Sequence, residues 1–174
     1  MAELSDAWSR VTQNLRERLG GPAPSVAAVG GEHAERLAEI HATAFAKPWS
    51  ALDFEAFLTN SAVRLDGLFL GRSPHPFGFV VTRCVVDEAE ILSVALAPEA
   101  RGRGHSRPLL ARHLDNLANA GIRRVHLEVE EGNRPALALY RRLGFSQTGF
   151  REGYYARPDG TRANALSMSL VLLP

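Results

Sequence analysis

Residues 91–110 read ILSVALAPEARGRGHSRPLL, an apolar strand that runs into a basic, glycine-rich turn and then into a helix. The first N–H groups of a helix lack intrahelical partners, and the helix dipole adds about half a positive charge, so this junction favours an anion. Gly102 and Gly104 allow close approach of the backbone to a ligand because they have no Cβ. Three side chains supply charge for phosphates: Arg101, Arg103 and Arg107.

The turn excludes two common phosphate motifs. A nucleotide-hydrolysing P-loop requires Gly-x4-Gly-Lys-Ser/Thr, and this turn contains no lysine. A dinucleotide-binding fold requires Gly-x-Gly-x-x-Gly, and Arg107 stands at the third glycine position. The turn by itself therefore predicts either phosphate binding without a named ligand or a solvated basic loop.

The segments on both sides of this turn predict an α+β fold, in an α/β three-layer arrangement. Three short segments rich in β-branched and aromatic residues predict an antiparallel meander: 68–70, 77–84 and 90–96. Helices and strands then alternate: His105–Ala120, Arg123–Glu130, Arg134–Leu143, Phe145–Arg151 and Ala165–Leu172. A meander followed by this alternation within one domain is typical of that fold class.

The N-terminal region predicts a separate amphipathic helix. Its apolar residues recur at helical spacing: Leu4, Trp8, Val11, Leu15 and Leu19. Gly20–Pro24 then interrupts the pattern. We therefore divide the chain into a helix and linker, residues 1–24, and one domain, residues 25–174. The helix is expected to dock on that domain, and a partner or dimer contact is the alternative.

The domain is expected to begin with a strand over Ser25–Val29 and a helix that starts at Glu32 and ends before Pro48. Ser50 is a candidate N-cap for the next helix. Asp53, three positions later, is the reciprocal half of a capping box.

Composition excludes several classes of protein. The 174 residues carry a formal net charge of +1, far less basic than a general nucleic-acid binder. No stretch approaches the roughly 20 apolar residues that span a bilayer, and no signal pattern precedes the domain. Cys84 is the only cysteine, so no internal disulfide forms. The six histidines show no ligand spacing. We predict a cytoplasmic protein without a metal.

The glycine-rich turn resembles the signature of the GCN5-related N-acetyltransferase (GNAT) superfamily, Gln/Arg-x-x-Gly-x-Gly/Ala. Residues 101–106 match it, with Ser106 at the last position in place of Gly or Ala. The resemblance implies a mixed, mostly antiparallel sheet with helices on both faces. It also implies a cleft where the fourth and fifth strands splay apart.

Within that superfamily, the chain is most similar to the bacterial ribosomal-protein alanine N-acetyltransferases. The similarity covers about residues 25–170. It rests on a Pro-Trp-Ser loop after Phe45, on LEVEEGN at 127–133, on ALYRRLGF at 138–145 and on GYY at 153–155. It implies acetyl-CoA as cosubstrate and a primary amine as acceptor, most often the N-terminal α-amine of a protein.

By this resemblance, the backbone of the fourth strand contacts the acetyl-pantetheine arm, the turn holds the pyrophosphate, and Asn133 also contacts coenzyme A. The implied cofactor residues are Val94, Ala95, Leu96, Arg101, Gly102, Arg103, Gly104, His105, Ser106, Arg107 and Asn133. Asn133 is in addition a candidate N-cap for the helix that begins at Arg134.

Acetyl transfer to an amine requires a base for the ammonium and an acid for the leaving thiolate. Glu128 is the candidate base, because His126, Glu128 and Glu130 alternate with apolar residues along one strand and the family motif falls on Glu128. Tyr140 is the candidate acid, and its alternative role is a core aromatic residue. Cys84 lies in an apolar strand, where a thiol is usually inert, so direct transfer in a ternary complex is expected.

The acceptor is expected to meet Trp49, Glu131, Tyr154 and Tyr155. The chain departs from the family's Gly-x-Glu-Asp-Ala-Leu segment, since Ala163 and Asn164 replace the acidic pair. Two other functions stay open at this stage: acetylation of a small-molecule amine, and a non-catalytic module that binds acyl-CoA.

Overall fold

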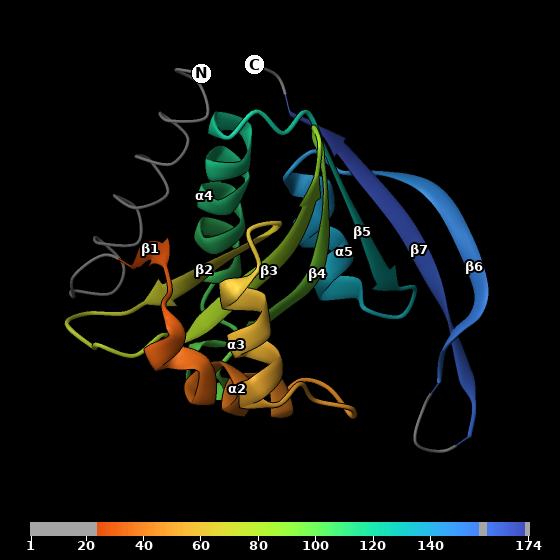
Figure 1. Cartoon of the computed structure of the whole chain (residues 1–174). Helices are drawn as coiled ribbons and strands as arrows, with labels where there is room; N and C mark the ends of the chain where they lie inside the picture. Colours follow the sequence, from red (N-terminus) through yellow and green to blue (C-terminus); the bar gives the residue numbers. More distant parts are fainter. Residues whose placement is uncertain (1–23, 157–159, 173–174) are drawn as a thin grey trace.

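A seven-stranded mixed sheet runs through the molecule in the order β1-β2-β3-β4-β5-β7-β6 (Figure 1). Its strands are β1 Ser25–Ala28, β2 Val63–Phe69, β3 Gly78–Val85, β4 Glu88–Leu96, β5 Arg124–Glu130, β6 Ser146–Ala156 and β7 Arg162–Val171. The computed structural model describes residues 24–156 and 160–172. The predicted amphipathic helix and its linker, except Pro24, lie outside the described residues.

Helices cover both faces of the sheet, which confirms the predicted α+β three-layer fold. They are η1 Gly31–His33, α2 Ala34–Ala42, α3 Ala51–Thr59, η2 Pro98–Ala100, α4 Ser106–Asn119 and α5 Arg134–Arg142. One buried core contains Leu110 of α4 and Leu137 of α5, and the other contains Leu37 of α2 and Phe54 of α3. No helix among the described residues is long and apolar enough to cross a membrane.

The only parallel pair among the described strands is β4 and β5, and it is short. Glu88–Ile91 pair with Arg124–Leu127, and the pairing then stops. β5 stays bonded to β7 over its whole length, and β4 stays bonded to β3. Beyond Ile91 the two strands diverge, as Figure 1 shows. This divergence confirms the predicted splay between the fourth and fifth strands.

A β-bulge at Leu92 changes which face each later residue of β4 presents. Ser93 lies opposite Val81 and Ile91 lies opposite Thr82, so Leu92 is the extra residue. Ile91 belongs to the α4/α5 core, and Val94 packs against that core three positions later. In a regular strand the alternation has a period of two, so Val94 would face the opposite side from Ile91.

Most of the predicted elements are present, although several boundaries differ. The capping box at Ser50 and Asp53 is confirmed, since each side chain binds the other residue's backbone N–H. α2 ends at Ala42, well before Pro48. β2 begins at Val63, five positions before the predicted strand at Leu68. The sequence pattern concealed this part of β2 because Asp66 is buried there.

Asp66 is accommodated by a buried polar network that joins β2, β3 and α4. Its carboxylate lies 2.7 Å from His113 Nδ1 and accepts a 3.0 Å hydrogen bond from Asn116. Thr82 Oγ1 lies 2.8 Å from His113 Nε2. Burial alone would raise the pKa of Asp66, but its hydrogen bonds outweigh burial and the pKa lies below the usual value.

Asp66→Ala is expected to lower the free energy of unfolding by about 3 kcal/mol at pH 7, because it leaves His113 and Asn116 without their buried partner. Urea denaturation measures this loss. The folded-state pKa of Asp66 is lowered, so its stabilisation is lost as the pH falls through that value. The difference from the wild type should therefore shrink below about pH 4.

Glu55→Ala, at an exposed position of α3, is the matched control and should stay within about 0.5 kcal/mol of the wild type. A similar loss in both variants would contradict a stabilising role for the network.

Candidate active site

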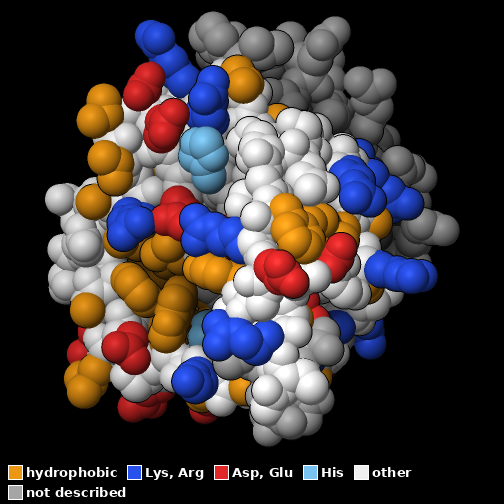
Figure 2. Space-filling model, turned by 90° about the vertical axis from the view of Figure 1, so that its right-hand side faces the viewer, with side chains coloured by type: hydrophobic (Ala, Val, Ile, Leu, Met, Phe, Trp, Pro, Cys, Tyr) orange, Lys and Arg blue, Asp and Glu red, His pale blue; other side chains and the backbone are white. Residues whose placement is uncertain are grey.

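A cleft of about 700 Å³ lies where β4 and β5 separate. Its lining comes from both faces of the sheet. From the α4/α5 side come Ser106, Pro135, Ala136, Leu139 and Tyr140, and from the α2/α3 side come His41, Phe45, Lys47 and Trp49. Figure 2 shows the side of the molecule that carries β6 and β7, where hydrophobic side chains gather in a hollow with basic and acidic side chains around it.

The β4 edge of this cleft is open backbone. Val94, Ala95 and Leu96 line the cleft, as predicted, and no strand pairs with them on the β5 side. An extended ligand can therefore bind alongside β4 as an additional strand would. Ser93 also lines the cleft and is buried, and its hydroxyl has no hydrogen-bond partner in the described part of the chain.

The glycine-rich turn forms an open cradle before α4. Gly102 and Gly104 have φ angles of 72° and 78°, and beyond the adjacent residues no atom lies within 4 Å of where a Cβ would stand at either position. No side chain caps α4 at His105. The Arg107 N–H donates to the Gly104 carbonyl at 3.3 Å and Pro108 has no N–H, so the Ser106 N–H at the first position of the helix is the one left for an anion. The turn therefore fits a pyrophosphate.

The predicted phosphate-binding side chains differ in their surroundings. Arg101, Gly102 and Ser106 line the cleft, whereas Arg103 and Arg107 are exposed beside it. His105 points into the protein and is only 2% exposed. Burial, and secondarily the charge of Arg103, lowers the pKa of His105. Because its ring is buried and neutral, His105 is better suited to bind a phosphate through its backbone than through a charged side chain.

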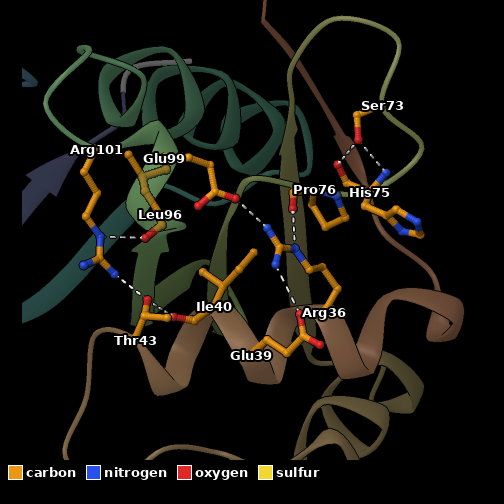
Figure 3. Close-up of polar contacts among 10 residues, drawn as sticks. All are labelled: Arg36, Glu39, Ile40, Thr43, Ser73, His75, Pro76, Leu96, Glu99 and Arg101. Carbon is orange, nitrogen blue, oxygen red and sulfur yellow. Dashed lines mark hydrogen bonds and ion pairs between the residues drawn. The ribbon is translucent and has the colours of Figure 1, made fainter.

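Arg101 already binds protein atoms. Its Nε donates a 2.8 Å hydrogen bond to the carbonyl of Leu96, and Nη2 donates to Thr43 Oγ1 at the end of α2 (Figure 3). Arg36 of α2 makes a second link, through Nη2 to Glu99 at 3.0 Å and through Nε to the Pro76 carbonyl at 3.3 Å. These contacts fix the start of the turn against α2.

The candidate base and the candidate acid approach the splay from opposite faces. Tyr140 belongs to the α4/α5 core and is 9% exposed, and burial raises its pKa to about 12. Glu128 lies on the other face of β5, since its neighbours Leu127 and Val129 are buried in that core. Both side chains line the cleft. The predicted alternation along β5 is confirmed.

Two side chains of β6 contact Glu128. Arg151 Nη1 lies 3.1 Å from Glu128 Oε1. Tyr154 donates a hydrogen bond to the same carboxylate, and this bond raises the pKa of Tyr154. The guanidinium carbon of Arg151 also lies 5.2 Å from the centre of the Tyr154 ring. The sequence did not single out Arg151, because the strand pattern gives no sign of what a residue faces across the sheet.

Asn133 is confirmed as the N-cap of α5. Its Oδ1 accepts a 3.2 Å hydrogen bond from the Ala136 N–H. The same residue lines the cleft, so the cap leaves the side-chain NH₂ available for a ligand. The two predicted roles are therefore compatible.

The predicted acceptor residues are only partly brought together. Trp49 and Tyr155 line the cleft, whereas Tyr154 and Glu131 are not part of its lining. Burial, followed by the charge of Glu128, raises the pKa of Tyr155 to about 12. Each of the four lies in or beside the β5, β6 or α2–α3 segments that border the splay.

His41, at the α2 end of the cleft, was missed from the sequence. Its ring is 3% exposed and stacks on Trp49, with the ring centres 4.5 Å apart. Nδ1 accepts a 3.0 Å hydrogen bond from the Trp49 N–H. Burial lowers the pKa of His41 to about 4, which keeps the ring neutral. In the sequence, a single histidine on an apolar helix face gave no sign that its ring would line the cleft and contact Trp49.

Asn164, which replaces an acidic family residue, braces the strands beside the cleft. Its Nδ2 donates a 2.9 Å hydrogen bond to Glu131 Oε2, and its Oδ1 accepts a 3.0 Å bond from the Gly153 N–H. Its backbone carbonyl also accepts from the Glu131 N–H at 3.0 Å. An aspartate cannot donate to Glu131, so Asn164 and Glu131 suit each other.

Residues 34–145 match the acetyltransferase (GNAT) family. The chain belongs to this family. It is 35% identical to a [ribosomal protein bS18]-alanine N-acetyltransferase of Haemophilus influenzae over 138 residues, which are 79% of this chain and 92% of that protein. The protein of the same name from Escherichia coli K12 is 34% identical over 131 residues, 75% of this chain and 86% of that protein.

Solved GNAT structures have the same fold. The crystal structure of the ribosomal-protein-S18-alanine N-acetyltransferase from Escherichia coli superposes with a TM-score of 0.79 at 28% identity, covering 87% of this chain and 95% of that one. Arabidopsis thaliana NAA60 in complex with acetyl-CoA gives a TM-score of 0.75 at 19% identity, covering 86% and 99%, and this likeness concerns the fold alone.

This GNAT chain is therefore an N-acetyltransferase with acetyl-CoA as its acetyl donor. The open β4 edge and the glycine cradle suit the extended arm and the pyrophosphate of that donor. Among residues 24–156 and 160–172, no three His, Cys, Asp or Glu side chains gather in a way that would hold a metal ion.

Asn164→Asp is expected to destabilise the fold by about 1–2 kcal/mol, because it places a second carboxylate against Glu131 and removes a donor. Thermal unfolding measures the loss. The double variant Asn164→Asp with Glu131→Gln should recover most of the stability, since glutamine supplies the missing N–H. A double variant that is no more stable than Asn164→Asp would contradict a stabilising role for the hydrogen bond between Asn164 and Glu131.

Proposed function

We propose that the chain acetylates the N-terminal α-amine of a protein, in the manner of the ribosomal-protein alanine N-acetyltransferases, by direct transfer within a ternary complex. The observation that carries the proposal is the placement of Glu128 and Tyr140 on opposite faces of one splay. Two relatives that are 34–35% identical and nearly fully covered carry that name, which supports a protein N-terminus as acceptor.

Glu128 acts as the general base. An α-ammonium group has a pKa of about 7.7–8.0, so a carboxylate can accept its proton at modest cost, directly or through one water. The Glu128 side chain is 19% exposed, which leaves room for such a water on the α2/α3 side of the sheet. Trp49 and Tyr155 line the same cleft as Glu128 and would hold the first residues of the acceptor.

Tyr140 acts as the general acid for the departing thiolate. Because burial raises its pKa to about 12, the phenol keeps its proton over the whole working range of pH. The β4 backbone N–H groups beside Val94 and Leu96 would polarise the thioester carbonyl. Gly102, Gly104 and the uncapped start of α4 would hold the pyrophosphate, with Arg103 and Arg107 beside it.

Cys84 has no place in this scheme, which favours direct transfer over an acetyl-enzyme. It is absent from the cleft lining, and burial raises the pKa of its thiol, which disfavours the nucleophilic thiolate. A ribosomal-protein acceptor would also place the enzyme in the cytoplasm.

The proposed acceptor is tested with acetyl-CoA and a library of peptides that begin with different residues, read by mass spectrometry. Peptides with a free N-terminal alanine are expected to be acetylated, and the same peptides with a blocked N-terminus are not. Faster turnover of polyamines or other small amines than of any peptide would overturn the proposal.

Glu128→Gln and Tyr140→Phe are each expected to lower kcat at least tenfold, which corresponds to about 1.4 kcal/mol or more of lost transition-state stabilisation. Acetyl-CoA binding, measured by calorimetry, should change little. Glu35→Gln, at an exposed position of α2, is the control and should keep wild-type turnover. Unchanged kcat in both site variants would remove these residues from the mechanism.

A further inference from the structure

Ser93 of β4 is a buried serine at the splay. It lines the cleft, it is 5% exposed, and its hydroxyl has no hydrogen-bond partner among residues 24–156 and 160–172. A buried hydroxyl without a partner destabilises a protein, because it gives up its hydrogen bonds to water and receives none in return. Such groups are uncommon in native proteins, and one that lines a catalytic cleft is a candidate to bind a ligand.

The bulge in β4 turns Ser93 toward the acceptor side of the sheet. In a regular strand Ser93 would share the face of Ile91, which belongs to the α4/α5 core. Because the bulge inserts one extra residue, Ser93 instead lies opposite Val81, with Ala95 next on the same face. Val81 and Ala95 belong to the α2/α3 core, and residues opposite each other in an antiparallel pair face the same side. The bulge therefore places Ser93 on the face that carries Glu128.

Ser93 and Glu128 stand at the point where the splay begins. The last pair that joins β4 to β5 is Ile91 with Leu127. Glu128 is the next residue of β5, and Ser93 is the second residue of β4 after that pair. Both residues line the cleft. An acceptor amine that approaches the acetyl group from the α2/α3 side therefore meets a carboxylate from one strand and a hydroxyl from the other.

We propose that the Ser93 hydroxyl binds the attacking amine of the acceptor and orients its lone pair toward the thioester carbon. A neutral primary amine has two N–H groups and one lone pair. When one N–H faces Glu128 and the other donates to Ser93 Oγ, the lone pair is left to face the carbonyl carbon, which is the orientation that attack requires. This role rests on the proposed function, in which Glu128 is the base.

The transfer step balances without any proton from Ser93. The amine binds in its neutral form, after the ammonium proton has passed through Glu128 to water. The N–C bond forms as the C–S bond breaks, and Tyr140 protonates the departing thiolate. Glu128 takes one amine proton, which returns to Tyr140 through water, and the N–H that donates to Ser93 remains in the amide product. Ser93 is therefore a group that positions the nucleophile and is neither acid nor base.

Ser93→Ala removes the hydroxyl and no other heavy atom. The kcat/KM for the acceptor is expected to fall about tenfold, equivalent to about 1.4 kcal/mol, because one hydrogen bond to the nucleophile is lost. The affinity for acetyl-CoA, measured by calorimetry, should stay unchanged. The Tm should stay the same or rise, since the variant removes a buried polar group that has no partner in the fold. A hydroxyl that only supported the fold would give a lower Tm.

Ser167→Ala is the matched control. Ser167 of β7 lies directly opposite Glu128 in the β5–β7 pair and lines a smaller hollow of about 340 Å³ beside Glu128, but it is not part of the cleft lining. This variant should keep the wild-type kcat/KM. An unchanged kcat/KM in Ser93→Ala, an equal loss in Ser167→Ala, a weaker affinity of Ser93→Ala for acetyl-CoA or a lower Tm would each overturn the role of Ser93.

A second acceptor separates this role from the proposed function. Because Ser93 binds the amine itself, the loss in Ser93→Ala is expected for a small primary amine as well as for a peptide. If only the small amine is acetylated and Ser93→Ala lowers that turnover about tenfold, the peptide assignment fails and the role of Ser93 stands. If the wild type and Ser93→Ala acetylate peptides at equal rates, the role of Ser93 fails and the peptide assignment stands.

Discussion

The limited pairing of β4 with β5 is the constraint on which the site depends. Two parallel strands share only four paired positions and then separate, because β5 stays bonded to β7 and β4 to β3. The separation leaves β4 without a strand partner on this side, and buried backbone groups are costly unless a side chain, water or a ligand binds them. The bulge at Leu92 adjusts the same strand so that Val94 packs on the α4/α5 side.

The splay also gives two ionisable groups different surroundings within one cleft. Tyr140 comes from the core beneath the sheet, and burial keeps its phenol protonated. Glu128 comes from the open face, where Arg151 and Tyr154 bind its carboxylate. The two faces of the sheet therefore bring a buried phenol and a more accessible carboxylate into one cleft, which suits the proposed roles of Tyr140 as proton donor and Glu128 as proton acceptor.

The segments that border the cleft are connected by side chains as well as by packing. Arg101 and Arg36 join α2 to the start of the glycine-rich turn. Asn164 joins β6 and β7 to the turn after β5. Such contacts hold loops from distant parts of the sequence at fixed positions, which lowers the conformational cost of binding two substrates together.

The sequence by itself determined the features that depend on neighbouring residues: the capping box at Ser50, the cap at Asn133, the alternation along β5 and the glycine cradle. Each follows from spacing within a few positions, so local geometry decides it. Only the tertiary structure decided the partners of Asp66, Arg101, Glu128 and His41. These contacts join residues far apart in the chain, and which charge or ring faces which is settled by how strands and helices pack, a relation that no local pattern records.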